Sequence, residues 1–573
     1  MSKLQDYKDR LEDLETRRRP WHDHWQEISE YVLPSHGFYA TSGWQPNYGE
    51  KRTSKIIDGT ATRAMRVLAS GMQGGLTSPS RPWFRLGVAD GDLMQNKAVK
   101  QYFDDCERRM YWFLSKTNYY QAVHAGYTEQ AGFGQMVLVV EADPLKGVVF
   151  HLVTAGQYSL AEGLDGKIDT LFRRFNMTVR SLVDRFGKGS VSRNVREQYT
   201  KNALDEYVEV VHVITPRYNR DTTKDDNKNM PWAGCYFELG ASDEEGFLEE
   251  KGYRSCPIIA PRWLTTGSDV YGRSPGMDVL PDVKMLQQMA STALRAEHKM
   301  VEPSVEAPAS MKGRINMLPA GVSYTQNSSG TPSIRPIYEV NPNIIGALEG
   351  KIERVQQAIK AGLYNDLFLL PDQMRPGVTA YEISVRNQEK MVLLGPVVER
   401  QTYEGLDVTI DRVWDIMEEG GMLPDPPEEI GAMEVKVEYI SLLAQVQKRA
   451  GTDAIQQMAG FAGQLAQLNP TVLDKLDVDE SMDQLGDLIG APAGIIRSDE
   501  EVKTIRDGRA QQQQQMVQQQ MEAEKSKRAM EAIGGIKDLS QADPNNLAQI
   551  MGVGGEMMNQ LGGGAPPAPG TGG

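Results

Sequence analysis

The stretch that decides the fold opens with Asp269-Val-Tyr-Gly-Arg-Ser-Pro-Gly276 and continues as far as Tyr381. Ser274 followed by Pro275 is typical of a helix N-cap with proline at the first helical position. Asn341 and Pro342 repeat this pattern at the start of a second apolar-periodic run. Residues 301–340, which lie between the two runs, contain several prolines and glycines that interrupt the helical period. The stretch therefore predicts a helix, a compact excursion and a returning helix.

Each predicted helix has a single apolar face, because its apolar residues recur every three or four positions. In the first helix, residues 277–300, this face comprises Val279, Val283, Leu286, Ala290, Ala293 and Leu294. The opposite face comprises Gln287, Gln288, Ser291, Arg295 and His298. In the second helix the apolar face comprises Ile345, Leu348, Ile352, Val355, Ile359 and Leu363. Pro281 leaves open a later start near Leu280, because proline beyond the first turn kinks a helix. Such a pair can pack on itself and on copies of itself.

Length and composition bound the remaining possibilities. A chain of 573 residues is too long for one hydrophobic core, so roughly two to four domains are expected. Three scattered cysteines, Cys106, Cys235 and Cys256, argue against a disulfide framework or zinc cluster and favour a reducing compartment. The charged N-terminus is unlike a signal peptide, and no apolar run is long enough to span a bilayer. A net charge of −15 argues against a protein that coats DNA, but it is compatible with a pore through which DNA slides.

The first 268 residues predict a mixed α/β region with an antiparallel sheet. Apolar spacing predicts helices over residues 2–33, 61–76, 99–114, 119–133 and 178–186. A period of two predicts strands over residues 83–88, 136–140, 148–153, 158–161, 168–177, 208–216, 234–239 and 253–261. Asp165-Gly166 is typical of a tight hairpin turn. The basic triplet Arg17-Arg18-Arg19 is expected to be a solvated part of the first helix rather than a nucleic-acid contact.

The second half of the chain is mainly helical in its pattern. Thr379-Ala-Tyr-Glu382 is a capping box that starts a long helix, which ends before Gly420 and should bend at Gly395-Pro396. Further helices are expected over residues 441–468, 476–489 and 499–505. From Gly421 onward the chain has 12 basic and 22 acidic residues, a local charge of −10. The glutamine-rich run 511–520 is either a solvated helix or disordered, and no order is expected over residues 562–573.

No catalytic constellation is evident in the sequence. Walker, His-Glu-x-x-His, Gly-x-Ser-x-Gly and Cys-x-x-Cys patterns are all missing. His22 and His24 invite a metal interpretation, but two histidines two positions apart on a helix point to different sides. We therefore expect no enzyme activity, no cofactor and no metal site.

The ordered set of elements resembles the portal proteins of short-tailed bacteriophages, which connect head to tail. The resemblance is carried by Leu76-Thr-Ser-Pro-Ser-Arg-Pro-Trp-Phe84, Tyr271-Gly-Arg-Ser-Pro275 and Gly377-Val-Thr-Ala-Tyr-Glu382 and covers about residues 1–500. It implies an α+β multidomain portal fold in a ring oligomer. Its parts would be a mixed α/β wing (1–268), stem helix 1 (269–300), a clip (301–340), stem helix 2 (341–366), a tunnel loop (367–378), a long kinked helix that returns to the wing (379–430), a mainly helical crown (431–510), and a Gln-rich then Gly/Pro-rich, partly disordered tail (511–573).

The resemblance also implies a function and partners. The chain would form a homo-oligomer, usually a dodecamer, at one vertex of the virion capsid, assembled in the cytoplasm of a bacterial host. Double-stranded DNA would pass through it without sequence readout during packaging and ejection, and the ring would nucleate capsid assembly. Its other partners would be the terminase large subunit, which hydrolyses ATP, the major capsid and scaffolding proteins, and the tail adaptor and nozzle proteins, with no membrane involved.

Candidate contact residues follow from the same resemblance. In the tunnel loop, Arg375 is expected to contact DNA in the channel, with Gln373 and Asp372 beside it. In the clip, the residues expected to dock partners are Lys312, Arg314 and Arg335. Contacts should be few, because each neutralised phosphate strengthens binding and would stall the duplex. An alternative stays open, in which Arg375 pairs with Asp372 and the clip arginines bind a neighbouring subunit. Two other classes also remain: a phage tail adaptor, and a metal-dependent enzyme that uses His22 and His24.

Overall fold

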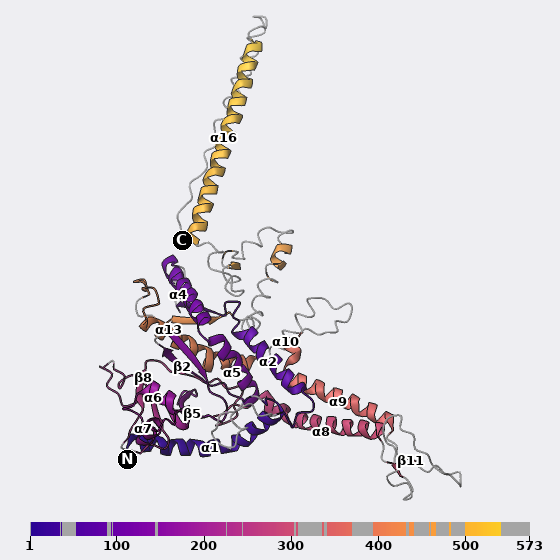
Figure 1. Cartoon of the computed structure of the whole chain (residues 1–573). Helices are drawn as coiled ribbons and strands as arrows, with labels where there is room; N and C mark the ends of the chain where they lie inside the picture. Colours follow the sequence, from indigo (N-terminus) through magenta and orange to yellow (C-terminus); the bar gives the residue numbers. More distant parts are fainter. Residues whose placement is uncertain are drawn as a thin grey trace, which may run out of the picture. The chain divides into compact units, whose positions relative to one another are not determined.

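The computed structural model describes residues 2–34, 36, 53–88, 93, 96–143, 147–224, 226–242, 245–302, 305–306, 335–336, 341–369, 394–430, 435–440, 458, 460–465, 479, 481–482 and 499–539. The chain divides into two compact units, Met1–Ala491 and Pro492–Gly573. The first unit contains both sheets and helices (Figure 1), so the expected mixed α+β class is confirmed. None of the described helices is both long enough and apolar enough to cross a membrane.

A five-stranded antiparallel sheet has helices on both of its faces. Its order is β4 (Tyr158–Glu162), β5 (Ile168–Thr178), β6 (Tyr207–Pro216), β7 (Trp232–Glu238) and β8 (Glu249–Tyr253). Helix α1 (Lys3–Tyr31) packs its leucines against one face, and α6 (Val179–Phe186) with α7 (Arg193–Thr200) covers part of the other. Helix α7 was not predicted, because it contributes a single fully buried residue, Val195, and its other positions are polar.

A three-stranded sheet, ordered β3-β2-β9, joins the main core. Its strands are β3 (Gly147–Leu152), β2 (Leu138–Asp143) and β9 (Ile258–Ile259). The single strand predicted over residues 253–261 is therefore wrong: the chain leaves the larger sheet at Tyr253 and joins β2 at Ile258. Pro257 lies between them and has no N–H to donate to a continuous ladder. The outer edge of β3 is closed by Asn118, whose amide bonds both the N–H and the carbonyl of Phe150 at 2.9 and 2.8 Å.

Segments distant in sequence complete the main core. Strand β1 (Phe84–Val88) pairs with β12 (Val435–Tyr439), which the sequence analysis did not predict. Around this pair and the smaller sheet lie α2 (Thr60–Leu76), α4 (Lys97–Lys116) and α5 (Tyr119–Phe133). The hydroxyl of Tyr111, on α4, accepts from the N–H groups of Trp83 and Phe84 at 2.8 and 2.7 Å, which closes the free edge of β1.

The later helices agree in part with the predicted pattern. Residues 379–393 lie outside the described residues; beyond them are α12 (Gly395–Gln401), the π-helical segment η2 (Thr402–Leu406) and α13 (Asp407–Glu419). Pro396 lies in the first turn of α12, and the predicted bend there stays a prediction, because the residues before it lie outside the described part of the chain. The end of α13 at Glu419, before Gly420, was predicted. In the second unit, α16 (Asp499–Leu539) is one helix that includes the glutamine-rich run, so the helical alternative for this run holds. The predicted helix over residues 476–489 and the 562–573 tail fall largely or wholly outside the described residues.

Candidate functional site

Two long helices form the feature around which the candidate site is built. Helix α8 (Pro275–Val301) begins at the predicted cap, where the Ser274 hydroxyl accepts from Met277 N at 3.0 Å and donates to the carbonyl of Gly132 at 2.7 Å. Pro281 is accommodated inside α8, so the alternative start near Leu280 is wrong. Helix α9 (Pro342–Gly362) has the predicted Asn341 cap, which accepts from Asn343 N at 3.0 Å. Both starts follow from a local side-chain cap and a proline in the first turn.

The two helices lie side by side and antiparallel (Figure 1). The end of α9 meets the beginning of α8, because a Cβ added at Gly362 would lie 2.5 Å from the Cγ1 of Val279. The predicted apolar face is confirmed at Val279, Val283, Leu286 and Ala293, which are all buried. Leu294 is 45% exposed, so the buried face ends before it.

Gln287 departs from the prediction, which assigned it to the polar face of α8. Its side chain is buried, and its carbonyl accepts from the backbone N–H groups of Ile57 and Asp58 at 2.7 and 2.9 Å. Its amide donates to the carbonyl of Asp58 at 2.9 Å. On α9, Gln356 donates to the Asp58 carboxylate at 2.8 Å. One short segment before α2 therefore ties both helices together through side-chain amides.

The N-terminal end of α8 rests on a closely packed junction. A Cβ added at Gly134 would overlap the carbonyl oxygen of Gly272, and Gly134 has a φ of +87°, so glycine is required there. The Tyr271 hydroxyl accepts from Leu160 N at 3.1 Å. On the same edge of β4, Arg18 donates to the carbonyls of Gly156 and Tyr158. The expectation that the basic triplet is solvated is thus wrong for its middle residue, which is buried and closes a strand edge.

A buried ion pair joins this junction to the later helices. Arg262 donates from Nη2 and Nε to the carboxylate of Glu404 at 2.8 and 3.2 Å, and its backbone N–H donates to the same group at 2.9 Å. Arg400 adds a bond to Glu404 at 2.6 Å. Burial alone would lower the pKa of Arg262, but the hydrogen bond and charge of Glu404, with Glu162, outweigh it and raise the pKa. Glu404 lies in the π-helical segment η2, whose widened turn is a feature often found at functional sites.

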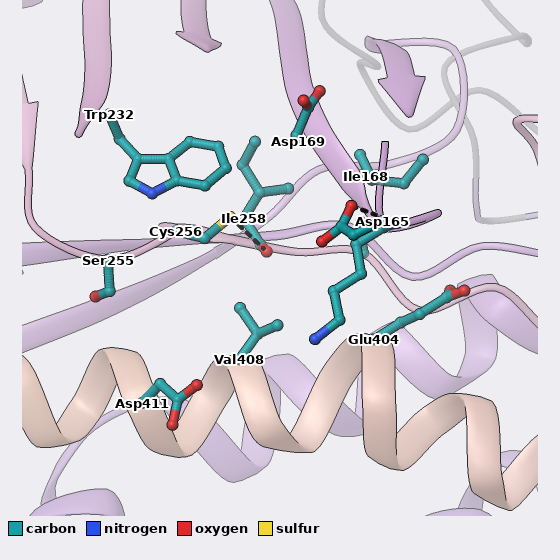
Figure 2. A pocket seen from close by; sticks show the side chains of 12 residues that line it. Asp165, Ile168, Asp169, Trp232, Ser255, Cys256, Ile258, Glu404, Val408 and Asp411 are labelled. Atoms are coloured by element: carbon teal, nitrogen blue, oxygen red, sulfur yellow. Dashed lines mark hydrogen bonds between the residues drawn. The ribbon is translucent and has the colours of Figure 1, made fainter. Parts of the chain in front are cut away.

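Glu404 also borders a hollow of about 220 Å³, seen in Figure 2. Trp232, Cys256 and Ile258 lie on one side of it, and Val408 and Asp411 project from the helix on the other. Lys167 also lines the hollow, with its ammonium 3.7 Å from the ring centroid of Tyr403. The walls mix apolar groups with carboxylates, and the Cys256 thiol donates to the backbone carbonyl of Ile258 at 3.6 Å.

The residues behind the metal interpretation do not assemble into a site. Burial first, and then the charge of Arg18, lowers the pKa of His22. Over the described part of the chain, three or more His, Cys, Asp or Glu side chains never converge as a metal ion would need.

Most of the predicted contact residues lie outside the described residues. These are Arg375, Gln373, Asp372, Lys312 and Arg314. Arg335 is described through its backbone, in β11 (Arg335–Pro336), which pairs with β10 (Val305–Glu306) between the two long helices. Arg262 and Glu404 were not among the predicted residues, because a pair 142 positions apart leaves no local pattern in the sequence.

The chain belongs to the bacteriophage head to tail connecting protein family, whose model matches residues 4–496. It is 40% identical over 503 residues to a probable portal protein of Bordetella phage BPP-1, covering 87% of this chain and 90% of the relative. It is 37% identical over 551 residues to the portal protein of Salmonella phage epsilon15, covering 95% and 97%. The chain also matches two solved structures, each with a TM-score of 0.35 and each covering 77% of this chain and 95% of the other. One is a chain of the virion of the native gene transfer agent particle, at 12% identity, and the other is a chain of the neck of the empty particle, at 11% identity.

Proposed function

We propose that this chain is the subunit of a portal ring at one capsid vertex, through which double-stranded DNA is packaged and ejected. The observation that carries the proposal is the match to portal proteins over 90% and 97% of their own lengths. A match of that extent favours a portal over a shorter tail adaptor, and over a metal-dependent enzyme built on His22 and His24. Within the proposal, the family's role is structural, and the energy of DNA movement comes from the terminase.

The helix pair has dimensions suited to a DNA channel. Twelve helices spaced about 9–10 Å apart put their axes on a circle roughly 35–38 Å across. Subtracting about 10 Å for helix thickness leaves a hole of roughly 25–28 Å, wide enough for a duplex, whereas six helices would leave roughly 7–9 Å. Helix α8, with 27 residues, would line about 40 Å of such a channel. A DNA conduit therefore needs a large ring, and the dodecamer usual in the family would meet this requirement.

We assign the parts of the chain to the portal architecture on this basis. Residues 1–268 would be the wing, α8 and α9 the stem, residues 301–340 the clip, 367–378 the tunnel loop, 379–430 the helix that returns to the wing, and 431–510 the crown. Strand β12, at the start of the crown range, pairs with β1 of the wing, so a separate crown would begin after Tyr439. Within the tunnel loop, Arg375 would touch DNA, with Gln373 and Asp372 beside it. In the clip, Lys312, Arg314 and Arg335 would dock partners such as the terminase and the tail adaptor.

The charges on the stem suit weak contact with DNA. Lys284 on α8 is held by Glu27 of α1 at 2.6 Å, so this cation is already compensated within the subunit. On the whole helix, Lys284, Arg295 and Lys299 are balanced by Asp278, Asp282 and Glu297, which oppose phosphate binding electrostatically. A stem of this kind would let a duplex slide rather than bind it.

The test is the mass of the purified assembly, with negative-stain images of the same sample. We expect particles near 760 kDa, twelve times the chain mass of 63.7 kDa, with a central hole. A monomer or dimer that persists at high protein concentration would overturn the proposal. Arg375 is then tested with Arg375→Gln and, as the control, Arg314→Gln in a packaging assay with the terminase. The tunnel-loop variant should change the rate of DNA movement in preformed rings, and the clip variant should change terminase binding.

A further inference from the structure

Two neighbouring arginines on β5 have opposite surroundings. Successive strand residues face opposite sides of a sheet, so Arg173 and Arg174 point away from each other. Arg174 faces α1 and pairs with the carboxylates of Glu15 and Glu209 at 3.4 and 3.0 Å. The Arg173 side chain makes no hydrogen bond or ion pair with any residue that the structure describes, and its Nε is buried without a partner. Its guanidinium carbon lies 4.4 Å from the ring centroid of Phe175.

Arg173 belongs to a row of polar side chains that crosses the larger sheet. It stands opposite His212 on β6, which stands opposite Tyr236 on β7. His212 is fully buried, its ring is stacked 3.9 Å from that of Tyr236, and neither of its nitrogens has a hydrogen-bond partner within the described residues. Buried polar groups are normally paired, so this row has unmet hydrogen-bonding capacity at two neighbouring positions.

One carboxylate faces this row, and it is already bound by other groups. Glu141 on β2 accepts from the Tyr236 hydroxyl at 2.6 Å and from Arg185 on α6 at 3.5 Å. Burial would raise the pKa of Glu141, but His212, the Tyr236 hydrogen bond, Lys251 and Arg185 together lower it to about 2. The carboxylate is therefore ionised and is matched by Arg185.

Among the described residues near this row, the cations outnumber the carboxylates that pair with them, and Arg173 is the cation left without an ion pair. Lys251, the third cation near the row, pairs with Glu249 at 3.3 Å. Glu141 is the carboxylate whose charge acts on Arg173, but it is already bonded by Arg185, and Glu249 pairs with Lys251. Among the described residues, no carboxylate forms an ion pair with Arg173. An unpaired charge with a buried donor is costly, so a structure normally supplies a counter-ion.

We propose that Arg173, with Arg185 and His151 at the rim, forms a binding site for an oxyanion such as phosphate, sulfate or a carboxylate. His151, on β3, has its Nε2 3.7 Å from the carboxylate of Glu141, beside Arg185. The site is reachable from solvent, because the side chains of His151 and Arg185 are 38% and 36% exposed. Guanidinium groups bind such anions through two parallel N–H bonds. Among the described residues, the Arg185 side chain donates hydrogen bonds only from Nη2, to Glu141 and Tyr236, so its other N–H groups can bind an anion. The site lies in the wing and goes beyond the proposed DNA channel.

The experiment compares thermal unfolding of the full chain in phosphate, sulfate, acetate and chloride at one ionic strength and one pH. We expect phosphate or acetate to raise the midpoint of the wild type above its value in chloride, and Arg173→Gln to abolish that increment. Arg180→Gln is the matched control, because Arg180 lies on the same helix as Arg185 but is 58% exposed. Its nearest recorded carboxylate, that of Asp205, lies 4.0 Å away. This variant should keep the full increment.

Three outcomes are informative in different ways. A response to phosphate and sulfate alone identifies a free tetrahedral oxyanion, and a response to acetate alone points to a carboxylate supplied by a second copy of the chain. The absence of any anion-specific increment in the wild type, or its retention in Arg173→Gln, overturns the proposal. If Arg173→Gln does not fold, Arg173→Lys keeps the charge but loses the two-bond geometry, and calorimetric titration with phosphate should then show affinity at least about tenfold weaker.

Discussion

Replacing Glu404 by glutamine is expected to destabilise the first unit by up to about 3–5 kcal/mol, because it leaves the buried charge of Arg262 with only Glu162, 3.4 Å away and 31% exposed, as a carboxylate partner among the described residues. The two side chains are only 4% and 3% exposed, so water cannot replace the lost carboxylate. The substitution preserves the size of the side chain, so packing changes little. The matched control is Glu197→Gln, which removes the partner of Arg193 from an ion pair whose members are 51% and 85% exposed. We expect that control to cost at most about 1 kcal/mol.

The assay is denaturant unfolding followed by tryptophan fluorescence, with hydrogen exchange of residues 395–419 as a local readout. A multidomain chain need not unfold in one step, so the local protection decides the result. The paired variant Arg262→Met with Glu404→Leu removes both buried charges and should recover part of the loss, because an apolar pair of similar size has no charge to desolvate. The backbone N–H of residue 262 still loses its acceptor, which limits the recovery. The reasoning is refuted if Glu404→Gln costs no more than Glu197→Gln, or if the paired variant is as unstable as the single one.

Three further effects follow from the same geometry. In the folded chain the pKa values of Glu141 and His212 are about 2 and about 3, below their usual 4.5 and 6.5, so the unfolded chain binds more protons in acid. The stabilisation that these two groups contribute is therefore full above about pH 6.5 and is lost as the pH falls toward 2. The unfolding midpoint of Glu141→Gln should accordingly depend less on pH below 4.5 than that of the wild type. Gln287→Leu leaves two backbone N–H groups without an acceptor and should cost about 1–3 kcal/mol and speed tryptic cleavage at Lys55, whereas exposed Gln288→Leu should do neither. Gly362→Val forces a side chain to within 2.5 Å of a valine on α8 and should lower the thermal midpoint, at a cost of about 1–3 kcal/mol; an unchanged midpoint would mean that the two helices are not packed this closely.

Local chemistry explains which parts of the helix pair were predictable. The starts of α8 and α9 follow from Ser274 and Asn341 with their prolines, since a cap and the residues it bonds lie within four positions. The buried role of Gln287 was not predictable, because its polarity assigns it to solvent until the segment at Asp58 is brought against it. The same limit applies to the ion pair of Arg262, whose energy depends on a partner far along the chain.

The strands also differ in how far a local pattern in the sequence predicts them. Most strands of the larger sheet have a clear period of two, and hairpin turns such as Asp165-Gly166 fix their neighbours. Strand β12 also alternates, with Val435, Val437 and Tyr439 on one face, so a weaker signal was present. Its pairing with β1 could not be inferred, because roughly 350 residues separate the two strands and no turn connects them.

The distribution of burial along α8 connects the fold to the proposed ring. Its first two-thirds are held by contacts within the subunit, from the Ser274 cap to the buried Ala293. Beyond that point Leu294, Met300 and Val301 are 45%, 43% and 76% exposed, and Ile344 at the facing end of α9 is 65% exposed. Apolar groups gathered at one end of a helix pair are typical of a surface that another chain covers. In the proposed ring that chain is the next subunit. Leu294→Ser should therefore weaken assembly while leaving the unfolding of the separate subunit nearly unchanged, and a variant that lost subunit stability instead would place this end of the pair in the core of its own chain.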